Sequence, residues 1–170
     1  MLLNLREIIE IPGASVDFET ELETDRLDFP AIKEYKAKPK AVGRVYNEAG
    51  ILNLTGEIRA DMVCVCDRCG CDFERTKLTE LHATIVEENA EDDPELFLLQ
   101  GDEIDLDEIL STCFILDMDS KFLCKEDCKG LCPVCGCNLN REQCGCQQPE
   151  WEPQGRTVRP FADLEWSDEE

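Results

Sequence analysis

The spacing of the cysteines constrains this chain more than any other feature of its sequence. Twelve of its 170 residues are cysteine, and the run C-x2-C-G occurs twice, at residues 66–70 and 132–136. The tight turn of such a run aims two sulfurs at one point, where backbone amides stabilise their negative charge. In a chain whose thiols stay reduced, this pattern indicates metal binding rather than a disulfide framework.

The late cysteine cluster, residues 124–146, is predicted to hold a structural zinc ion. Cys132 and Cys135 supply two sulfurs. We favour completing the site within the cluster, because closing a short loop costs less conformational entropy than closing a long one. The predicted ligands are therefore Cys132, Cys135, Cys144 and Cys146, with Cys124 and Cys128 as alternates, and the distant pair Cys66 and Cys69 as a third source of two sulfurs.

The early cluster permits a second site. If residues 67–68 form a two-residue hairpin turn, side-chain alternation along the paired strands puts four sulfurs on one face. That face would be a second metal site, a buried surface of small residues, or a reducible cross-strand pair, and the structural interpretations are favoured. The four residues are Cys64, Cys66, Cys69 and Cys71.

Hydrophobic periodicity predicts an α+β fold, mainly an antiparallel β-sheet or a partly open barrel with one or two helices. Residues 16–22 alternate as a strand does, and residues 41–46 and 51–60 flank a polar connection that ends in Gly50 and suits a hairpin. Residues 62–66 and 71–86 continue the meander, whereas residues 33–40 resemble a connection. Asp105 is the predicted N-cap of a helix that reaches about residue 116, because Asp107 and Glu108 lie in its first turn.

These patterns divide the chain into three parts. Residues 1–123 are expected to form a β-rich core domain with a helix near residues 105–116. Residues 124–146 form a cysteine-rich zinc-binding module, and residues 147–170 an acidic, flexible tail with scattered prolines. The tail is expected either to serve solubility or to dock through its aromatic residues.

The charge of the chain disfavours one class of partner. With 39 acidic and 17 basic side chains, the formal net charge is −22, and such a field repels polyanions and anionic membranes. No apolar run is long enough for a membrane span or a secretory signal, so a cytoplasmic location is expected. A single stretch concentrates positive charge, as a solvated strand edge or as an RNA-facing patch: Lys33, Lys36, Lys38, Lys40 and Arg44.

The cysteines indicate architecture rather than catalysis. A closed site of four cysteines offers no open coordination position, and the chain has one histidine. We therefore expect no enzymatic activity. The rival hypothesis is a thiol redox or zinc-responsive regulatory protein, although neither C-x2-C pair opens a helix of the kind that activates thioredoxin-like thiols.

Three runs together resemble the YceD family, which is implicated in the accumulation of large-subunit ribosomal RNA. They are the tetrapeptide at residues 66–69, the helix start at residues 102–106 and the run CKGLCPVCGCNLN at residues 128–140. The resemblance implies an α+β fold dominated by an antiparallel sheet and an accessory role in ribosome assembly without established enzymatic activity. Residues 117–121 depart from it, since a proline-containing apolar segment is expected there.

Because the chain is strongly acidic, a basic protein is the more favourable direct partner within the role that this resemblance implies. We expect the direct partner to be a ribosomal protein or an assembly factor of the large subunit, because many such proteins are basic. Ribosomal RNA would then be reached indirectly or through the local basic patch.

Overall fold

The computed structural model describes residues 1–87 and 96–146. Its helical elements are α1 (Arg6–Ile9), the 3-10 turn η1 (Thr24–Arg26) and α2 (Leu106–Leu116). Its strands are β1 (Leu2–Asn4), β2 (Ser15–Glu21), β3 (Ile32–Tyr35), β4 (Lys40–Glu48), β5 (Ile51–Val65), β6 (Asp72–Val86), β7 (Leu96–Leu98) and β8 (Glu103–Asp105).

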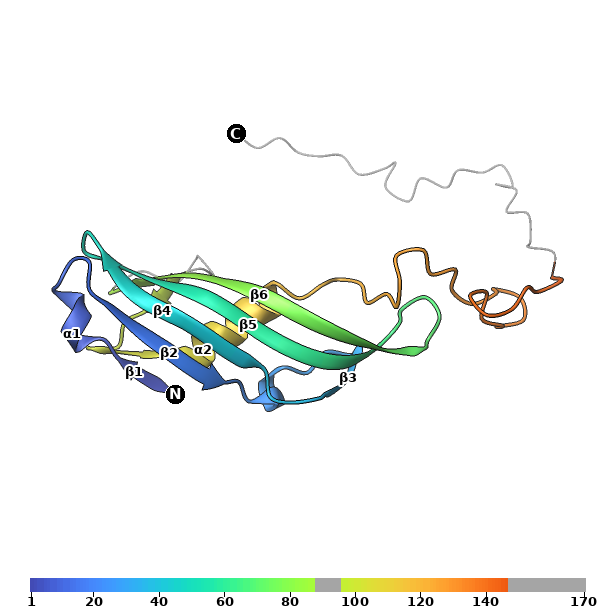
Figure 1. Ribbon diagram of the computed structural model, residues 1–170, viewed down its shortest axis with the longest axis horizontal. Coiled ribbons are helices and arrows are strands. Elements are labelled where there is room, and N and C mark those ends of the chain that lie inside the picture. Colours follow the sequence, from blue (N-terminus) through green and yellow to red (C-terminus); the bar gives the residue numbers. More distant parts are fainter. Residues whose placement is uncertain (88–95, 147–170) are drawn as a thin grey trace, which may run out of the picture.

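A six-stranded sheet dominates the structure (Figure 1). Strands β2, β4, β5 and β6 pair antiparallel in that order, and β7 adds to β6 in parallel. Strand β3 pairs with β5 along the stretch that β4 leaves free, and β1 and β8 form a separate two-stranded sheet. The mainly antiparallel sheet with few helices is confirmed, and the described strands do not close into a barrel.

The long hairpin of β5 and β6 determines where the early cysteine cluster lies. The sequence predicted a break between residues 60 and 62, but β5 is one strand of 15 residues. Alternation continues across that point, since Ala60, Met62 and Cys64 are all fully buried on one face. The uninterrupted hairpin carries the cluster to its tip, beside the C-terminal segment that is coloured orange in Figure 1.

Residues 33–40, expected as a connection, contain part of a strand. Ile32 lies opposite Cys64 and Tyr35 opposite Met62, and a register shift between them marks a β-bulge. The Tyr35 hydroxyl donates to the carbonyl of Leu27, 2.8 Å away, which anchors the preceding loop. The short strand therefore covers the far part of β5, which would otherwise be an open edge.

Helix α2 covers one face of the sheet (Figure 1). It begins where the sequence predicted, since the Asp105 side chain accepts a hydrogen bond from the N–H of Asp107 and caps the helix. Leu106, Leu110 and Phe114 form its buried stripe and belong to the main core. None of the helices among residues 1–87 and 96–146 is long and apolar enough to cross a membrane.

The hairpin between β4 and β5 is tied to the N-terminal segment by a buried asparagine. Ala49 and Gly50 both have positive φ, which is typical of the two-residue turns that match strand twist. Asn47 is 1% exposed, and its Nδ2 donates to the carbonyls of Ile8 and Ile9 at 2.9 and 2.7 Å. The sequence predicted this hairpin, whereas the role of Asn47 depends on tertiary contacts.

The three-part division of the chain stays a prediction. The proposed acidic tail, residues 147–170, lies outside the described residues. The proposed boundary at residue 124 falls within a segment whose cysteines lie against the β5–β6 hairpin.

Candidate metal centres

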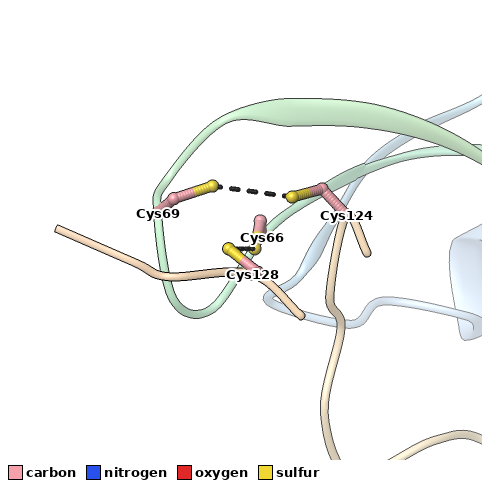
Figure 2. Close-up of side chains that lie close together, drawn as sticks. All are labelled: Cys66, Cys69, Cys124 and Cys128. Atoms are coloured by element: carbon pink, nitrogen blue, oxygen red, sulfur yellow. Dashed lines mark hydrogen bonds between the residues drawn. The ribbon is translucent and has the colours of Figure 1, made fainter. Parts of the chain in front are cut away.

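The first group of sulfurs joins the hairpin tip to the C-terminal segment (Figure 2). It consists of Cys66, Cys69, Cys124 and Cys128, whose sulfurs all lie within 4.8 Å of one another. The Sγ atoms of Cys66 and Cys128 are 3.8 Å apart, and those of Cys69 and Cys124 are 3.7 Å apart. Four thiolates around zinc, with Zn–S bonds of about 2.3 Å in a tetrahedron, have sulfurs about 3.8 Å apart. The group therefore fits a tetrahedral metal ion.

The hairpin tip folds into a compact turn, here named the early knuckle, residues 66–71. The N–H of Cys66 donates to the carbonyl of Cys71, and the N–H of Gly70 donates back to the carbonyl of Cys66, at 2.9 and 2.8 Å. Gly70 has φ of 65°, a conformation that glycine adopts without strain. This arrangement brings the sulfurs of Cys66 and Cys69 to the same side.

The early knuckle corrects the expected grouping of the early cysteines. The turn is longer than the two residues assumed, so Cys64 lies opposite Phe73 rather than Cys71. Cys64 is fully buried in the main core, and the Cys71 Sγ accepts a hydrogen bond from Asn138 Nδ2 at 3.1 Å. Neither belongs to the first group of sulfurs.

The segment that follows α2 runs along β6 and places Cys124. The acidic residues at its start, which depart from the expected apolar pattern, form ion pairs with cationic side chains of β6. Two backbone contacts then fix the segment at the early knuckle. The contacts are Lys77–Asp117 at 2.8 Å, Arg75–Asp119 at 2.6 Å, Asp67 N–H to the Phe122 carbonyl at 2.8 Å, and Phe122 N–H to Asp67 Oδ2 at 2.6 Å.

The second group consists of Cys132, Cys135, Cys144 and Cys146, whose sulfurs also lie within 4.8 Å of one another. Residues 132–137, the late knuckle, have the same backbone pattern as the early knuckle. The N–H of Cys132 donates to the carbonyl of Cys137, and the N–H of Gly136 donates to the carbonyl of Cys132, at 2.8 and 2.9 Å. Each C-x2-C-G run thus supplies half of a four-sulfur group.

A family model for the large ribosomal RNA subunit accumulation protein YceD matches residues 54–165. The match covers most of the chain, including both knuckles, α2 and every cysteine of the two groups. The chain belongs to the YceD family. No curated protein and no solved structure matches it.

The electrostatics of this YceD-family chain favour a cation at both groups. The N–H groups of Cys135 and Val134 lower the pKa of Cys132 to about 6. Burial raises the pKa of Cys66, but hydrogen bonds from the N–H groups of Cys124, Cys69 and Arg68 outweigh it and lower that pKa to about 6. Thiolate, the form that binds metal, is therefore available at neutral pH.

Two other sulfurs, those of Cys69 and Cys146, ionise less readily, and sulfurs of the same group lie beside each of them. The N–H of Cys71 lowers the pKa of Cys69, but burial and the neighbouring sulfurs of its group outweigh it and raise that pKa. The sulfur of Cys135 and burial raise the pKa of Cys146. Four thiolates in one group need a positive ion to share their charge, which is what a divalent metal supplies.

These pKa directions predict how bound metal responds to acid. Cys66 and Cys132 have lowered pKa values, so their thiolates persist at pH 7 and become protonated as the pH falls through about 6. We expect zinc to remain bound at pH 7 and its affinity to weaken as the pH falls through about 6, because protons then compete with the metal for these two sulfurs. A chromophoric chelator that reports free zinc across a pH series measures this. Release already complete at pH 7 would contradict the prediction.

The structure brings the predicted late ligands together but pairs the alternates differently. Cys124 and Cys128 complete the early pair instead of the late one. The sequence held a signal for this arrangement: once Cys144 and Cys146 are assigned to the late knuckle, the early C-x2-C pair and the pair Cys124 and Cys128 each lack two partners, and each can complete the other. Their roles as metal ligands stay predictions.

The cations of the predicted basic patch all have acidic neighbours in the structure. Each of its five members is exposed and lies within salt-bridge distance of a carboxylate. An exposed cation that already has a carboxylate partner binds phosphate less favourably than a free one. The pairs are Lys33–Asp72, Lys36–Glu74, Lys38–Glu23, Lys40–Glu21 and Arg44–Asp17.

Proposed function

We propose that this protein is a non-enzymatic accessory factor for large-subunit ribosomal RNA accumulation and ribosome assembly, with two structural zinc ions. The observation that carries the proposal is the first group of sulfurs, which joins two distant segments in a chain of the YceD family. Its four sulfurs have the mutual spacing that a tetrahedral ion requires. The proposed role is to present a folded surface rather than to carry out a reaction.

The donor set favours zinc among the common metals. Thiolates are soft ligands, and four of them in a tetrahedron suit zinc or an iron–sulfur centre rather than magnesium or calcium. A bound zinc ion would supply a structural cross-link, and structural zinc contributes about 10–16 kcal/mol in isolated zinc fingers. All four positions around it would be taken by cysteine, so no site is left to activate water.

The charge distribution favours a protein as the direct partner. The net charge of −22 opposes binding to a phosphate backbone, and the cationic stretch at residues 33–44 is paired with acidic side chains. A basic ribosomal protein or assembly factor of the large subunit has the complementary charge. Ribosomal RNA would be reached through that partner, with the protein acting in the cytoplasm.

The test is gradient sedimentation of gently lysed cells at low and moderate salt. We expect the protein to migrate with precursors of the large subunit at both salt concentrations, because protein contacts lose less affinity with salt than phosphate contacts do. The triple variant Lys36→Glu, Lys38→Glu, Lys40→Glu is expected to migrate with the same particles. The variant Arg6→Glu, at an exposed position outside the stretch, is the control for a charge reversal elsewhere on the surface.

Two results would contradict this proposal. If the protein stays at the top of the gradient under both conditions, stable binding to the particle fails. If it leaves the particle at moderate salt and the triple variant never binds, the lysine stretch contacts RNA phosphates directly.

A thiol redox or zinc-responsive regulator is the second candidate, and the lowered pKa values of Cys66 and Cys132 favour it, since low-pKa thiols are reactive. In that case the cysteines would be modified readily without chelation and would cycle between dithiol and disulfide. In a structural zinc protein, the same thiols are protected until the metal is removed.

A further inference from the structure

The segment between the late knuckle and Cys144 contains an asparagine that contacts the first group. The Nδ2 of Asn140 donates to the Sγ of Cys128 at 3.3 Å. Its Oδ1 accepts a hydrogen bond from the backbone N–H of Lys129 at 2.9 Å. Lys129 is the residue that follows Cys128 in the chain. One side chain therefore satisfies a sulfur of the first group and the backbone beside it.

A second asparagine holds the first in place. The Oδ1 of Asn138 accepts two hydrogen bonds from Asn140, one from its backbone N–H at 2.9 Å and one from its Nδ2 at 3.0 Å. The Nδ2 of Asn138 donates to the Sγ of Cys71, on the early knuckle, at 3.1 Å. These bonds orient the Asn140 amide so that its Nδ2 faces Cys128.

The two asparagines are also part of the structure that forms the second group. Leu131 forms a bridge with Asn138, and the N–H of Leu139 donates to the carbonyl of Gly130 at 3.0 Å. The late knuckle lies between these two short segments. Residues 138–140 thus lie between Cys135 and Cys144, two members of the second group.

The connection from Cys128 to the late knuckle lies directly against the early knuckle. Arg68 Nη1 donates to the carbonyl of Cys128 at 3.0 Å. A Cβ atom at Gly130 would be 3.0 Å from the Arg68 carbonyl oxygen, so the two backbones approach closely. The two cysteine groups therefore share a continuous network of contacts.

We propose that Asn140, held by Asn138, couples the two groups, so that a metal ion bound at either group raises the affinity of the other. Metal at the second group fixes both ends of the loop that carries the asparagines, which presents the Asn140 amide to Cys128. Metal at the first group fixes Cys128, which is the acceptor for that amide. Because coupling between two binding sites is reciprocal, both affinities change by the same factor. The inference rests on the proposed binding of two metal ions.

The test uses the full chain, stripped of metal and titrated with zinc against a chromophoric chelator. Alkylation of unprotected cysteines, followed by mass spectrometry, identifies which group loses its ion. Asn140→Ala is expected to weaken binding at the first group by about 10–100-fold, the usual cost of losing a hydrogen bond to a metal ligand. Asn53→Ala, on strand β5 and outside the network, is the matched control.

Two further variants separate positioning from loop folding and measure the coupling. Asn140→Asp keeps an oxygen that can accept a hydrogen bond from the N–H of Lys129 but loses the donor to Cys128. Its zinc affinity at the first group should therefore be no higher than that of Asn140→Ala. The double variant Cys135→Ser, Cys144→Ser removes two sulfurs of the second group and no sulfur of the first. We expect it to lower the first-group affinity as well. In the Asn140→Ala background, the same double substitution should cause little further loss.

The outcomes distinguish a failure of the proposed coupling from a failure of the proposed metal binding. If the wild type binds two zinc ions while Asn140→Ala and the double variant keep wild-type affinity at the first group, the coupling is overturned and the metal sites stand. Wild-type affinity in Asn140→Asp would also overturn the role of the amide as donor. If the wild type binds no metal, both proposals fall together.

Discussion

Replacing Cys66 and Cys69 with serine is expected to lower the metal content of the purified protein from two zinc ions per chain to one. The two sulfurs form half of the first group, and the two that remain, on Cys124 and Cys128, cannot complete a tetrahedral site alone. Elemental analysis at saturating zinc measures the stoichiometry. In the wild type, thiol labelling should leave the eight cysteines of the two groups unmodified until a chelator is added.

The control for this variant is Cys64→Ala, two residues earlier in the sequence. Cys64 is fully buried in the main core and belongs to neither group, so this variant should retain two zinc ions. A full complement of zinc in the Cys66→Ser, Cys69→Ser variant would contradict the ligand assignment. Rapid labelling of the grouped cysteines without chelation would favour the redox regulator instead.

The same double substitution should loosen the segment between α2 and the late knuckle. Ion pairs and backbone hydrogen bonds position this segment against β6, but the carboxylates of both pairs are accessible to water, which screens the attraction. Hydrogen exchange should therefore increase across residues 117–131 and remain unchanged in the centre of β5. Equal protection in the variant and the wild type would show that the segment is held without metal.

Replacing Phe114 with alanine is expected to lower the free energy of unfolding by about 3–5 kcal/mol, the usual cost of removing a buried phenylalanine side chain. Phe114 is fully buried where α2 meets the sheet, and its ring packs edge-on against Phe29 with centroids 6.4 Å apart. Denaturant unfolding at fixed excess zinc, followed by circular dichroism, measures the change. Metal content should stay at two ions per chain under native conditions.

Leu116→Ala is the matched control on the same helix. Its side chain is 59% exposed, so the variant should change stability by less than about 0.5 kcal/mol. A loss below about 1 kcal/mol for Phe114→Ala would mean that α2 contributes little to the stability of the core.

Local sequence patterns predicted the secondary-structure elements that are formed by residues close together in the sequence. The alternation at residues 16–22 indicates β2, the polar connection before Gly50 forms a hairpin, and Asp105 caps α2 through a hydrogen bond to a residue two positions away. The grouping of Cys132 and Cys135 with Cys144 and Cys146 could be predicted for the same reason, because these cysteines lie within 15 residues of one another. The closure of a short loop does not depend on the rest of the fold.

The composition of the first group was decided by tertiary structure. Cys66 and Cys128 are separated by 62 positions in the sequence, and a penalty for closing so long a loop favoured ligands within the late cluster. The sheet removes that penalty, because the β5–β6 hairpin and the segment along β6 already place the two cysteine pairs together. The basic stretch is a second example, since its acidic partners come from β2, β6 and the loop after β2.

The sequence by itself determined that this chain carries two C-x2-C-G knuckles, a mainly antiparallel sheet, one amphipathic helix and a strongly acidic charge. Each of these follows from residue types and from spacings of a few residues. Only the tertiary structure decided which cysteine pairs complete each other, whether the lysines are free, and how Asn140 comes to lie beside Cys128. These contacts join segments that are distant in the chain, and their proximity depends on how the sheet is paired.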